Sequence, residues 1–370
     1  MSRRKSSRLS RRRYRSAQLP LKRVVYTEQL LTPVPLAVST KPRLRDQHST
    51  GQCWMYAGVA LLETLGVGGY IDMTNLYKRY LLKKTKWLVD CLKRPLDERT
   101  RQMVLDGGVD DGGSWSTLLD LFSEGVKIVP RPRHECPHAA HKSNQLLELL
   151  RTQLRCGAPL RDMHHNIEVC LPDAQGDVKE KTVDKLFKTS IQLMNAPHVP
   201  MHEWCRSYYD IGDVSSYNVS MDVLMKSCRT MLSKGYGIWA TFALGHDFDW
   251  TRLQAGGYRH DDVLRPAPHH TRDERILSRD LKPDHAMLIV GCKHKVWRIH
   301  NSWGERSKLD TLHKSVLEES NDHGILATEE WMRTNLFHAV VRNDCIAGTI
   351  PRPPKAPRVL PVWDILSTVA

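Results

Sequence analysis

One cysteine and the residues that follow it constrain this chain more than any other feature. Cys53 ends a polar, glycine-containing segment and stands directly before an apolar run. Far downstream lie Asp284-His285 and then Asn301-Ser302-Trp303-Gly304. The order cysteine, histidine, asparagine is that of a thiol nucleophile, its base and the group that orients the base. We therefore expect a fold that joins an early helix to two later strands.

Local patterns predict helices first and strands later. Residues 53–65 form the first expected helix, with Ser49 and Thr50 as candidate N-caps and Gly66 as the C′ residue. Residues 106–115 form a turn-rich cluster. This order indicates the α+β class. Further helices are expected at residues 77–92, 116–124, much of 142–195 and 221–232, and strands at 236–244, 285–292 and 296–300.

The N-terminal segment is strongly basic. The chain of 370 residues has a formal net charge of +14, and residues 1–27 contain no Asp or Glu. Such a segment cannot bury enough apolar surface to fold alone. Three interpretations stay open: a solvated tail, an organelle-targeting segment, or an arm that neutralises phosphates of RNA or another polyanion. The arginines of that arm would be Arg3, Arg4, Arg11, Arg12 and Arg13.

Other compositional signals point to an intracellular protein. No stretch approaches the roughly 18 apolar residues of a membrane helix, and the N-terminus has no apolar signal region. The nine cysteines are scattered and odd in number, which favours reduced thiols over a disulfide framework. We expect a cytoplasmic or mitochondrial location and no contact with membranes.

The chemistry of the cysteine sets further requirements. A thiol in the first turn of a helix faces the positive end of the helix dipole, which lowers its pKa. His285 can exchange the proton, and Asn301 can orient the imidazole without adding charge. Gln47 and the backbone N–H of Cys53 are candidate donors to an oxyanion. Each residue alone is more often structural, but the complete ordered set is not a common coincidence.

Four motifs together resemble a known family. Residues 46–54 resemble the nucleophile motif of papain-fold cysteine peptidases, and residues 301–305 resemble their asparagine motif. Residues 109–115 resemble the Gly-Gly loop that lines their substrate cleft. Residues 360–370 resemble the terminal arm of the bleomycin hydrolase (aminopeptidase C) branch. The resemblance extends from about residue 47 to 370 and is poor across the helical middle.

The resemblance implies a two-lobed papain-like fold, with a helical lobe, an antiparallel β lobe and a C-terminal arm in the cleft. Trp303 would cover the His285–Asn301 hydrogen bond, and the Ala370 carboxylate would meet the free amine of a peptide substrate. Gly112 and Gly113 would let the peptide backbone approach closely. These roles describe an aminopeptidase of short peptides without a cofactor or metal. Its catalytic set would be Cys53 as nucleophile, His285 as acid–base partner, Asn301 as orienter and Gln47 as oxyanion donor.

The chain departs from that family in its middle. Cys53 and His285 are 285 − 53 = 232 residues apart, whereas a papain-type core separates them by roughly 130–150. We therefore expect a helical insertion at about 140–215, inside a catalytic domain of residues 28–345 that follows the tail 1–27 and precedes the arm 346–370. Family insertions build a hexameric barrel. Because this chain is shorter, a hexamer is in doubt, although a homo-oligomer stays open.

Two functions of different classes stay open. The complete catalytic set favours a cysteine-type aminopeptidase. The basic tail and the short insertion favour a peptidase-like protein recruited to a ribonucleoprotein, such as an organelle ribosome, with activity reduced or lost. A zinc site in the His- and Cys-containing segment is disfavoured, because its spacing is unusual and no second cluster accompanies it. That segment contains His134, Cys136, His138 and His141.

Overall fold

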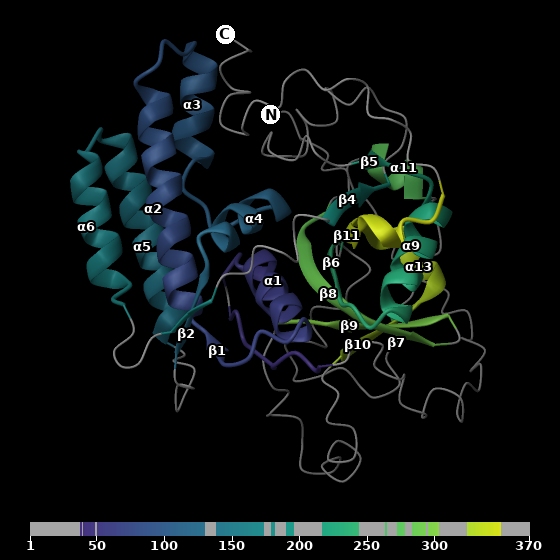
Figure 1. The fold of residues 1–370 in the computed structure, drawn as a ribbon. Helices are drawn as coiled ribbons and strands as arrows, with labels where there is room; N and C mark the ends of the chain where they lie inside the picture. Colours follow the sequence, from purple (N-terminus) through teal and green to yellow (C-terminus); the bar gives the residue numbers. More distant parts are fainter. Residues whose placement is uncertain are drawn as a thin grey trace, which may run out of the picture. The chain divides into compact units, whose positions relative to one another are not determined.

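The computed structural model describes twelve ranges of the chain. The chain divides into units 1–33 and 34–370, and every described residue lies in the second unit. The helices α2, α3, α5 and α6 pack together, and an eight-stranded sheet carries most of the strands (Figure 1). The described residues are 38, 40–48, 50–129, 138–173, 179–181, 190–195, 217–243, 263–264, 272–277, 283–293, 295–302 and 324–348.

The helix that begins at the cysteine is almost completely buried. Helix α1 covers Cys53–Thr64, and only Cys53 and Tyr56 lie outside its buried set. It begins after Gln52 without a side-chain cap, so the predicted N-caps are wrong. The Thr50 hydroxyl instead donates to the Gln47 carbonyl. Gly66 has φ +83° just after the helix, which confirms it as the C′ residue.

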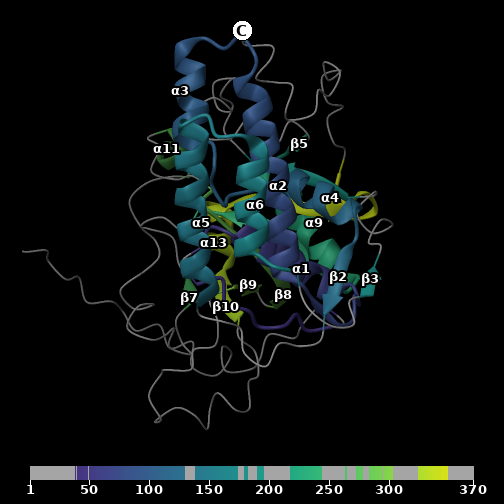
Figure 2. The same ribbon diagram turned by 90° about the vertical axis from the view of Figure 1, so that its left-hand side faces the viewer.

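The helical side is built around α2, Met73–Leu92, which starts at the Asp72 cap. Figure 2 shows α2, α3, α5 and α6 running alongside one another. The cluster predicted as turns at 106–115 is helical at its start, because α3 continues to Gly107. The other elements are α3 (Glu98–Gly107), α4 (Trp115–Ser123), α5 (His138–Arg155), α6 (Leu160–Cys170), and the small sheet β1 (Tyr70–Ile71), β2 (Val126–Val129) and β3 (Lys179–Lys181).

The large sheet has the order β5-β4-β11-β6-β8-β9-β10-β7. Pairing is antiparallel from β4 to β10, but the edge pairs β4–β5 and β10–β7 are parallel. The expected antiparallel sheet is therefore mixed at both edges. The strands are β4 (Ser190–Met194), β5 (Tyr217–Asn218), β6 (Ile238–Phe242), β7 (Val263–Leu264), β8 (His285–Lys293), β9 (Val296–His300), β10 (Gly324–Thr328) and β11 (Leu336–Arg342).

One predicted helical region contains a strand. Ser190–Met194 lies inside the range expected to be largely helical, yet it pairs with β11. Periodicity cannot separate a short buried strand from a helix. The partner strand decides the outcome here, because Leu193 and Gln192 are both buried in the sheet.

Two hydrophobic cores fill the described part of the chain. The first joins α1, α2, α4, α5 and α6. The second lies between the sheet and two further helices, α9 (Met221–Ser233) and α13 (Glu329–Asn335). Helix α1 contacts β8 and β6, so it connects the helical core to the sheet. The helix α11 (Arg272–Leu277) and the 3-10 turn η2 (Asn343–Cys345) complete the described elements.

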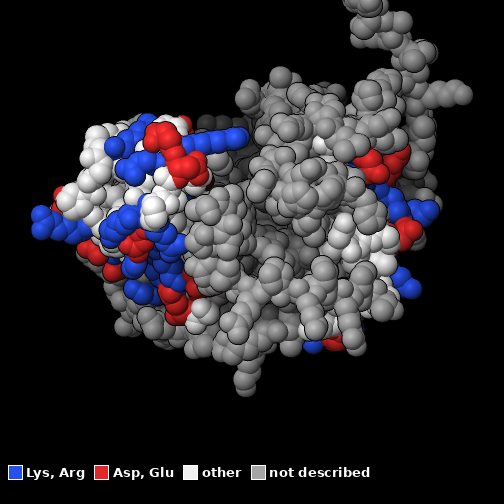
Figure 3. Space-filling model, turned by 90° about the horizontal axis from the view of Figure 1, so that it is seen from above, with Lys and Arg blue, Asp and Glu red and all other residues white. Residues whose placement is uncertain are grey.

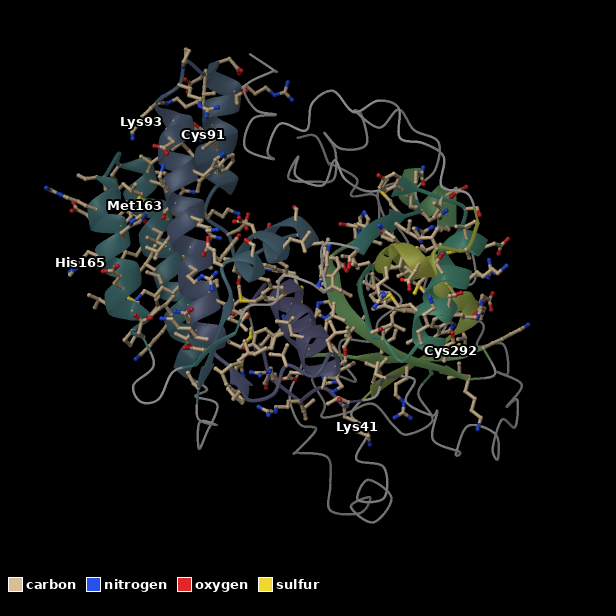
Figure 4. The ribbon with its side chains drawn as sticks, viewed as in Figure 1. Lys41, Cys91, Lys93, Met163, His165 and Cys292 are labelled. Carbon is tan, nitrogen blue, oxygen red and sulfur yellow. The ribbon has the colours of Figure 1, made fainter. Side chains whose placement is uncertain are left out.

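Charged side chains of both signs and free thiols occur on several elements of the described part of the chain. On the described part of the face in Figure 3, Lys and Arg are interspersed with Asp and Glu. Lys83 and Asp120 are one pair of opposite charges that form an ion pair. Every described cysteine is a free thiol. Figure 4 shows Cys91 on α2 and Cys292 on β8. Within the described ranges, no helix is long and apolar enough to cross a membrane, and no three ligand-type side chains could share a metal ion.

Candidate active site

The structure brings Cys53 to the start of strand β8. Cys53 is the first residue of α1, and His285 is the first residue of β8. The backbone N–H of Ala286 donates to the Cys53 sulfur at 3.4 Å. Strand β8 pairs with β6, and α1 lies against both strands. Cys53 thus contacts the residue that follows His285, at the point where a buried helix begins beside a central strand.

Asn301 follows β9, the antiparallel partner of β8, so the hairpin returns it to His285. The Oδ1 atom of Asn301 lies 2.8 Å from Nε2 of His285. The same Oδ1 accepts the backbone N–H of Ser302 at 2.8 Å, which fixes the orientation of the carboxamide. Because Oδ1 is an acceptor, His285 carries its proton on Nε2. Its Nδ1 is then the ring nitrogen that can accept another proton.

Gln47 is buried and tied to the residue after Asn301. Its backbone N–H donates to the Ser302 carbonyl at 2.8 Å, and its Oε1 accepts the Ser302 hydroxyl at 2.5 Å. Its Nε2 donates to the Thr50 carbonyl at 2.7 Å. Ser302 therefore holds both Gln47 and Asn301. The sequence motif contains Ser302, but nothing in the pattern showed that it would join the two.

The Gly-Gly loop, residues 109–115, contacts residues on either side of Cys53 through Asp111. The side-chain carboxylate of Asp111 accepts a hydrogen bond from the Gly51 N–H at 2.5 Å. The main-chain carbonyl of Asp111 accepts one from the Trp54 indole N–H at 2.7 Å. A Cβ on Gly113 would stand 2.5 Å from Cε2 of Trp54. Packing against Trp54 therefore requires glycine at position 113. This requirement is independent of any contact that the exposed Gly112 and Gly113 make with a substrate. Sequence reasoning missed Asp111, because a turn-forming Asp-Gly is its ordinary explanation.

Burial is the largest influence on the pKa values of Cys53 and His285. It raises the pKa of the Cys53 thiol to about 11; the N–H groups of Ala286 and Trp54 lower this pKa, and Asp111 and Asp284 raise it. Burial also lowers the pKa of His285, against opposing effects of Asn301 and Asp284. Cys53 occupies the predicted helix start, but the expected fall in its pKa does not occur. Both shifts favour the uncharged form of each group, the thiol of Cys53 and the neutral imidazole of His285.

Several predicted residues lie outside the described ranges. They are Trp303, Ala370, the terminal segment 349–370 and the five N-terminal arginines. The side chains of the His- and Cys-containing segment, with His134, Cys136, His138 and His141, also lie outside them.

Comparisons with known proteins place the chain. The model of the Peptidase C1-like family matches residues 22–211 and 178–367. The chain belongs to this family. Aminopeptidase C of Listeria monocytogenes is 22% identical and covers 89% of this chain and 86% of its own length. Cysteine proteinase 1, mitochondrial, of Saccharomyces cerevisiae is 21% identical and covers 88% of this chain and 80% of its own.

A solved structure agrees with the family assignment. The crystal structure of PepW from Lactobacillus rhamnosis HN001 has a TM-score of 0.64 at 19% identity, covering 86% of this chain and 84% of that one. The fold is the papain-like peptidase fold. The predicted resemblance to the bleomycin hydrolase and aminopeptidase C branch is confirmed, as is the assignment to the cysteine-type peptidases.

Proposed function

We propose that this protein is a cysteine-type aminopeptidase that hydrolyses short peptides at Cys53. The observation that carries the proposal is the convergence of the nucleophile helix with the His285–Asn301 pair. Homologues named aminopeptidase C support the reaction class. The continuous hydrogen-bonded path from His285 through Asn301 and Ser302 to Gln47 supports the individual roles.

Acylation begins from the neutral pair. His285 takes the thiol proton at Nδ1 as the sulfur attacks the scissile carbonyl carbon. The imidazolium then donates this proton to the leaving amine, and the thioester forms. A water molecule, deprotonated by the same imidazole, attacks the thioester carbon. The carbon–sulfur bond breaks, the acid leaves, and the imidazolium returns the proton to the Cys53 sulfur. Proton transfer in the attack removes the need for a resting thiolate, which the burial of Cys53 opposes.

Charge on the substrate oxygen requires donors. The first N–H groups of a helix have no intrahelical acceptor, and the Cys53 N–H is the first of α1. The Gln47 carboxamide has two N–H groups, of which one bonds the Thr50 carbonyl. We assign the second to the oxyanion. Ser302 takes no part in the chemical steps. Its hydroxyl donates to Oε1 of Gln47 and so keeps this carboxamide in place.

The finer architecture is also a proposal. The two hydrophobic cores correspond to the two lobes, with residues 140–215 contributing the insertion and residues 346–370 the arm. The Ala370 carboxylate binds the substrate ammonium, which limits cleavage to the first residue. Appending residues after Ala370 should convert single-residue release into internal cleavage of a decapeptide. An unchanged product pattern would contradict the role of the arm in limiting cleavage to the first residue. It would not affect the proposed role of Cys53 as nucleophile.

Contact with a polyanion is a separate proposal, which can coexist with hydrolysis. Residues 1–27 hold ten Lys and Arg and no acid, against a net charge of +14 for the whole chain. We assign RNA binding to that segment, within an intracellular protein of the cytoplasm or mitochondrion. Deleting residues 1–23 should abolish co-sedimentation with RNA at moderate salt, and retained binding would dismiss the assignment. Equal hydrolysis by both forms would show that the two properties are independent.

A further inference from the structure

The Gly-Gly loop is held by four consecutive main-chain carbonyls, which accept hydrogen bonds from side chains of α5, α2 and α1. Each of these carbonyls is therefore directed toward the helices, and the donors on the helices fix the path of the loop. The hydrogen bonds run from Arg151 to Val109 at 2.6 Å, from Tyr80 to Asp110 at 3.2 Å and also to Gly112, and from Trp54 to Asp111 at 2.7 Å.

Lys84 fixes the direction in which the Tyr80 hydroxyl donates. Both residues are buried on α2, and the Lys84 ammonium lies 3.1 Å from the Tyr80 oxygen. A lysine ammonium has only donors, so the Tyr80 oxygen accepts this hydrogen bond. The single hydroxyl hydrogen is then left for the loop, where the Gly112 carbonyl is the nearest acceptor. Lys84 is itself held by the Asp110 carboxylate at 2.7 Å.

The Tyr80 ring is fixed as well as its hydroxyl. Its centroid lies 5.1 Å from the Trp54 ring in an edge-on arrangement and 6.2 Å from the Tyr77 ring in a stacked one. Trp54 also packs on Gly113, where a Cβ would lie 2.5 Å from the indole. The Gly112–Gly113 peptide is therefore held at both ends, by Tyr80 at its carbonyl oxygen and by Trp54 at the α-carbon of Gly113.

This arrangement leaves one side of the Gly112–Gly113 peptide available. The peptide is trans, so its N–H points away from its carbonyl. Because the Gly112 carbonyl is directed at Tyr80, the Gly113 N–H is directed away from α2. Gly113 is exposed, and its N–H makes no hydrogen bond to any other residue that the structure describes. Two adjacent glycines are conformationally permissive and would not fix this direction by themselves.

We propose that Tyr80 is a positioning residue for peptide binding. Its hydroxyl, oriented by Lys84, keeps the Gly113 N–H directed outward, where this group donates to a main-chain carbonyl of a bound peptide. The proposal rests on the proposed peptidase function and deepens it, because it names the residue that prepares the loop for the substrate. Tyr80 takes no part in the chemical steps. Loss of its hydroxyl should weaken recognition of a peptide main chain without changing the reactivity of Cys53.

The test compares two reagents that alkylate Cys53 in the full-length protein, followed on the Cys53 peptide by mass spectrometry. Iodoacetamide is too small to reach the loop, whereas a dipeptidyl chloromethyl ketone carries a peptide main chain. Tyr80→Phe removes the hydroxyl and keeps the ring. In this variant the rate constant for the chloromethyl ketone should fall about two- to tenfold, the range expected for one lost hydrogen bond. The rate constant for iodoacetamide should be unchanged.

Tyr77→Phe is the matched control. Tyr77 is buried on the same helix and stacks on Tyr80, but its hydroxyl donates to none of the loop carbonyls. The ratio of the two rate constants should therefore equal that of the wild type. An unchanged ratio in Tyr80→Phe, whether both rate constants fall or neither does, would overturn the proposal, because the hydroxyl would then have no specific effect on peptide recognition.

Turnover gives a second measurement of the same contact. For a peptide substrate, Tyr80→Phe should raise KM about two- to tenfold and leave kcat unchanged. A fall in kcat at unchanged KM would contradict the proposal. Alkylation does not require hydrolysis, so a protein that reacts with both reagents but cleaves no peptide would contradict the proposed function and would still report on Tyr80 through the ratio.

Discussion

The hydroxyl of Ser302 donates to Oε1 of Gln47 across 255 positions of the sequence. The backbone of the same serine donates to Oδ1 of Asn301, and its carbonyl accepts the Gln47 N–H. One residue thus fixes both the group that orients His285 and the proposed oxyanion donor. A substitution at Ser302 should therefore affect both the orientation of His285 and the position of Gln47.

Removing the Ser302 hydroxyl tests this link. Ser302→Ala leaves the buried Oε1 of Gln47 without its donor, which should cost about 1–3 kcal/mol of unfolding free energy. It should also lower kcat about tenfold because Gln47 loses its orientation, with little change in KM. Ser123→Ala, at an exposed serine on α4, is the control and should change neither quantity. Full activity in Ser302→Ala would show that the link is only structural.

The close packing of Gly113 on Trp54 predicts an intolerance to any side chain. Because a Cβ would lie 2.5 Å from the indole ring, Gly113→Ala should destabilise the protein by about 1–3 kcal/mol and reduce activity by moving Trp54. Gly107→Ala is the matched control, since nothing lies within 4 Å of its Cβ position at the end of α3. It should be neutral or slightly stabilising in thermal denaturation. Equal effects of the two substitutions would contradict the packing argument.

The acid side of the activity profile should report His285. Below its pKa, His285 is protonated while the thiol still holds its proton, so it cannot act as base. Burial lowers this pKa from the ordinary value of 6.5, and the midpoint of the acid limb of kcat/KM should therefore lie below pH 6.5. The hydrogen bond to Asn301 raises the His285 pKa, so Asn301→Ala should move the midpoint lower still and decrease kcat. A midpoint above 6.5 in the wild type would contradict the described burial.

Protonation of His338 should lower the free energy of unfolding as the pH falls. Burial lowers its pKa from 6.5 to about 3, with Arg272 adding to the shift, and its Nδ1 lies 2.7 Å from the Thr241 hydroxyl. Because the unfolded chain binds this proton first, the contribution is complete above pH 6.5 and is lost as the pH falls toward 3. The loss is roughly 1.4 kcal/mol per pH unit in that window.

Denaturant titrations at several pH values check this prediction. His338→Gln should flatten the pH dependence while lowering stability at pH 7. His165→Gln, at the exposed His165 of α6 labelled in Figure 4, should leave the slope unchanged. A slope that persists in His338→Gln would assign the acid sensitivity to other groups.

The sequence was sufficient for the parts of the site that have local signatures. The helix at Cys53, the hairpin that carries His285 and Asn301, and Gly66 all follow from residue patterns that short-range geometry enforces. What the sequence could not show depends on long-range pairing. The strand at 190–194 is decided by β11, and the roles of Ser302 and Asp111 arise only when distant segments meet. The high pKa of Cys53 is likewise a product of burial, which the helix dipole alone does not reveal.

The central claim is that Cys53 hydrolyses peptides by nucleophilic attack. The most direct measurement compares wild type with Cys53→Ala for release of a fluorogenic amine from aminoacyl substrates, alongside labelling by an acylating thiol-directed probe. We predict hydrolysis and stoichiometric labelling at Cys53 in the wild type, with both lost in Cys53→Ala at unchanged thermal stability. Wild-type protein that hydrolyses no faster than Cys53→Ala and takes up no probe would contradict it.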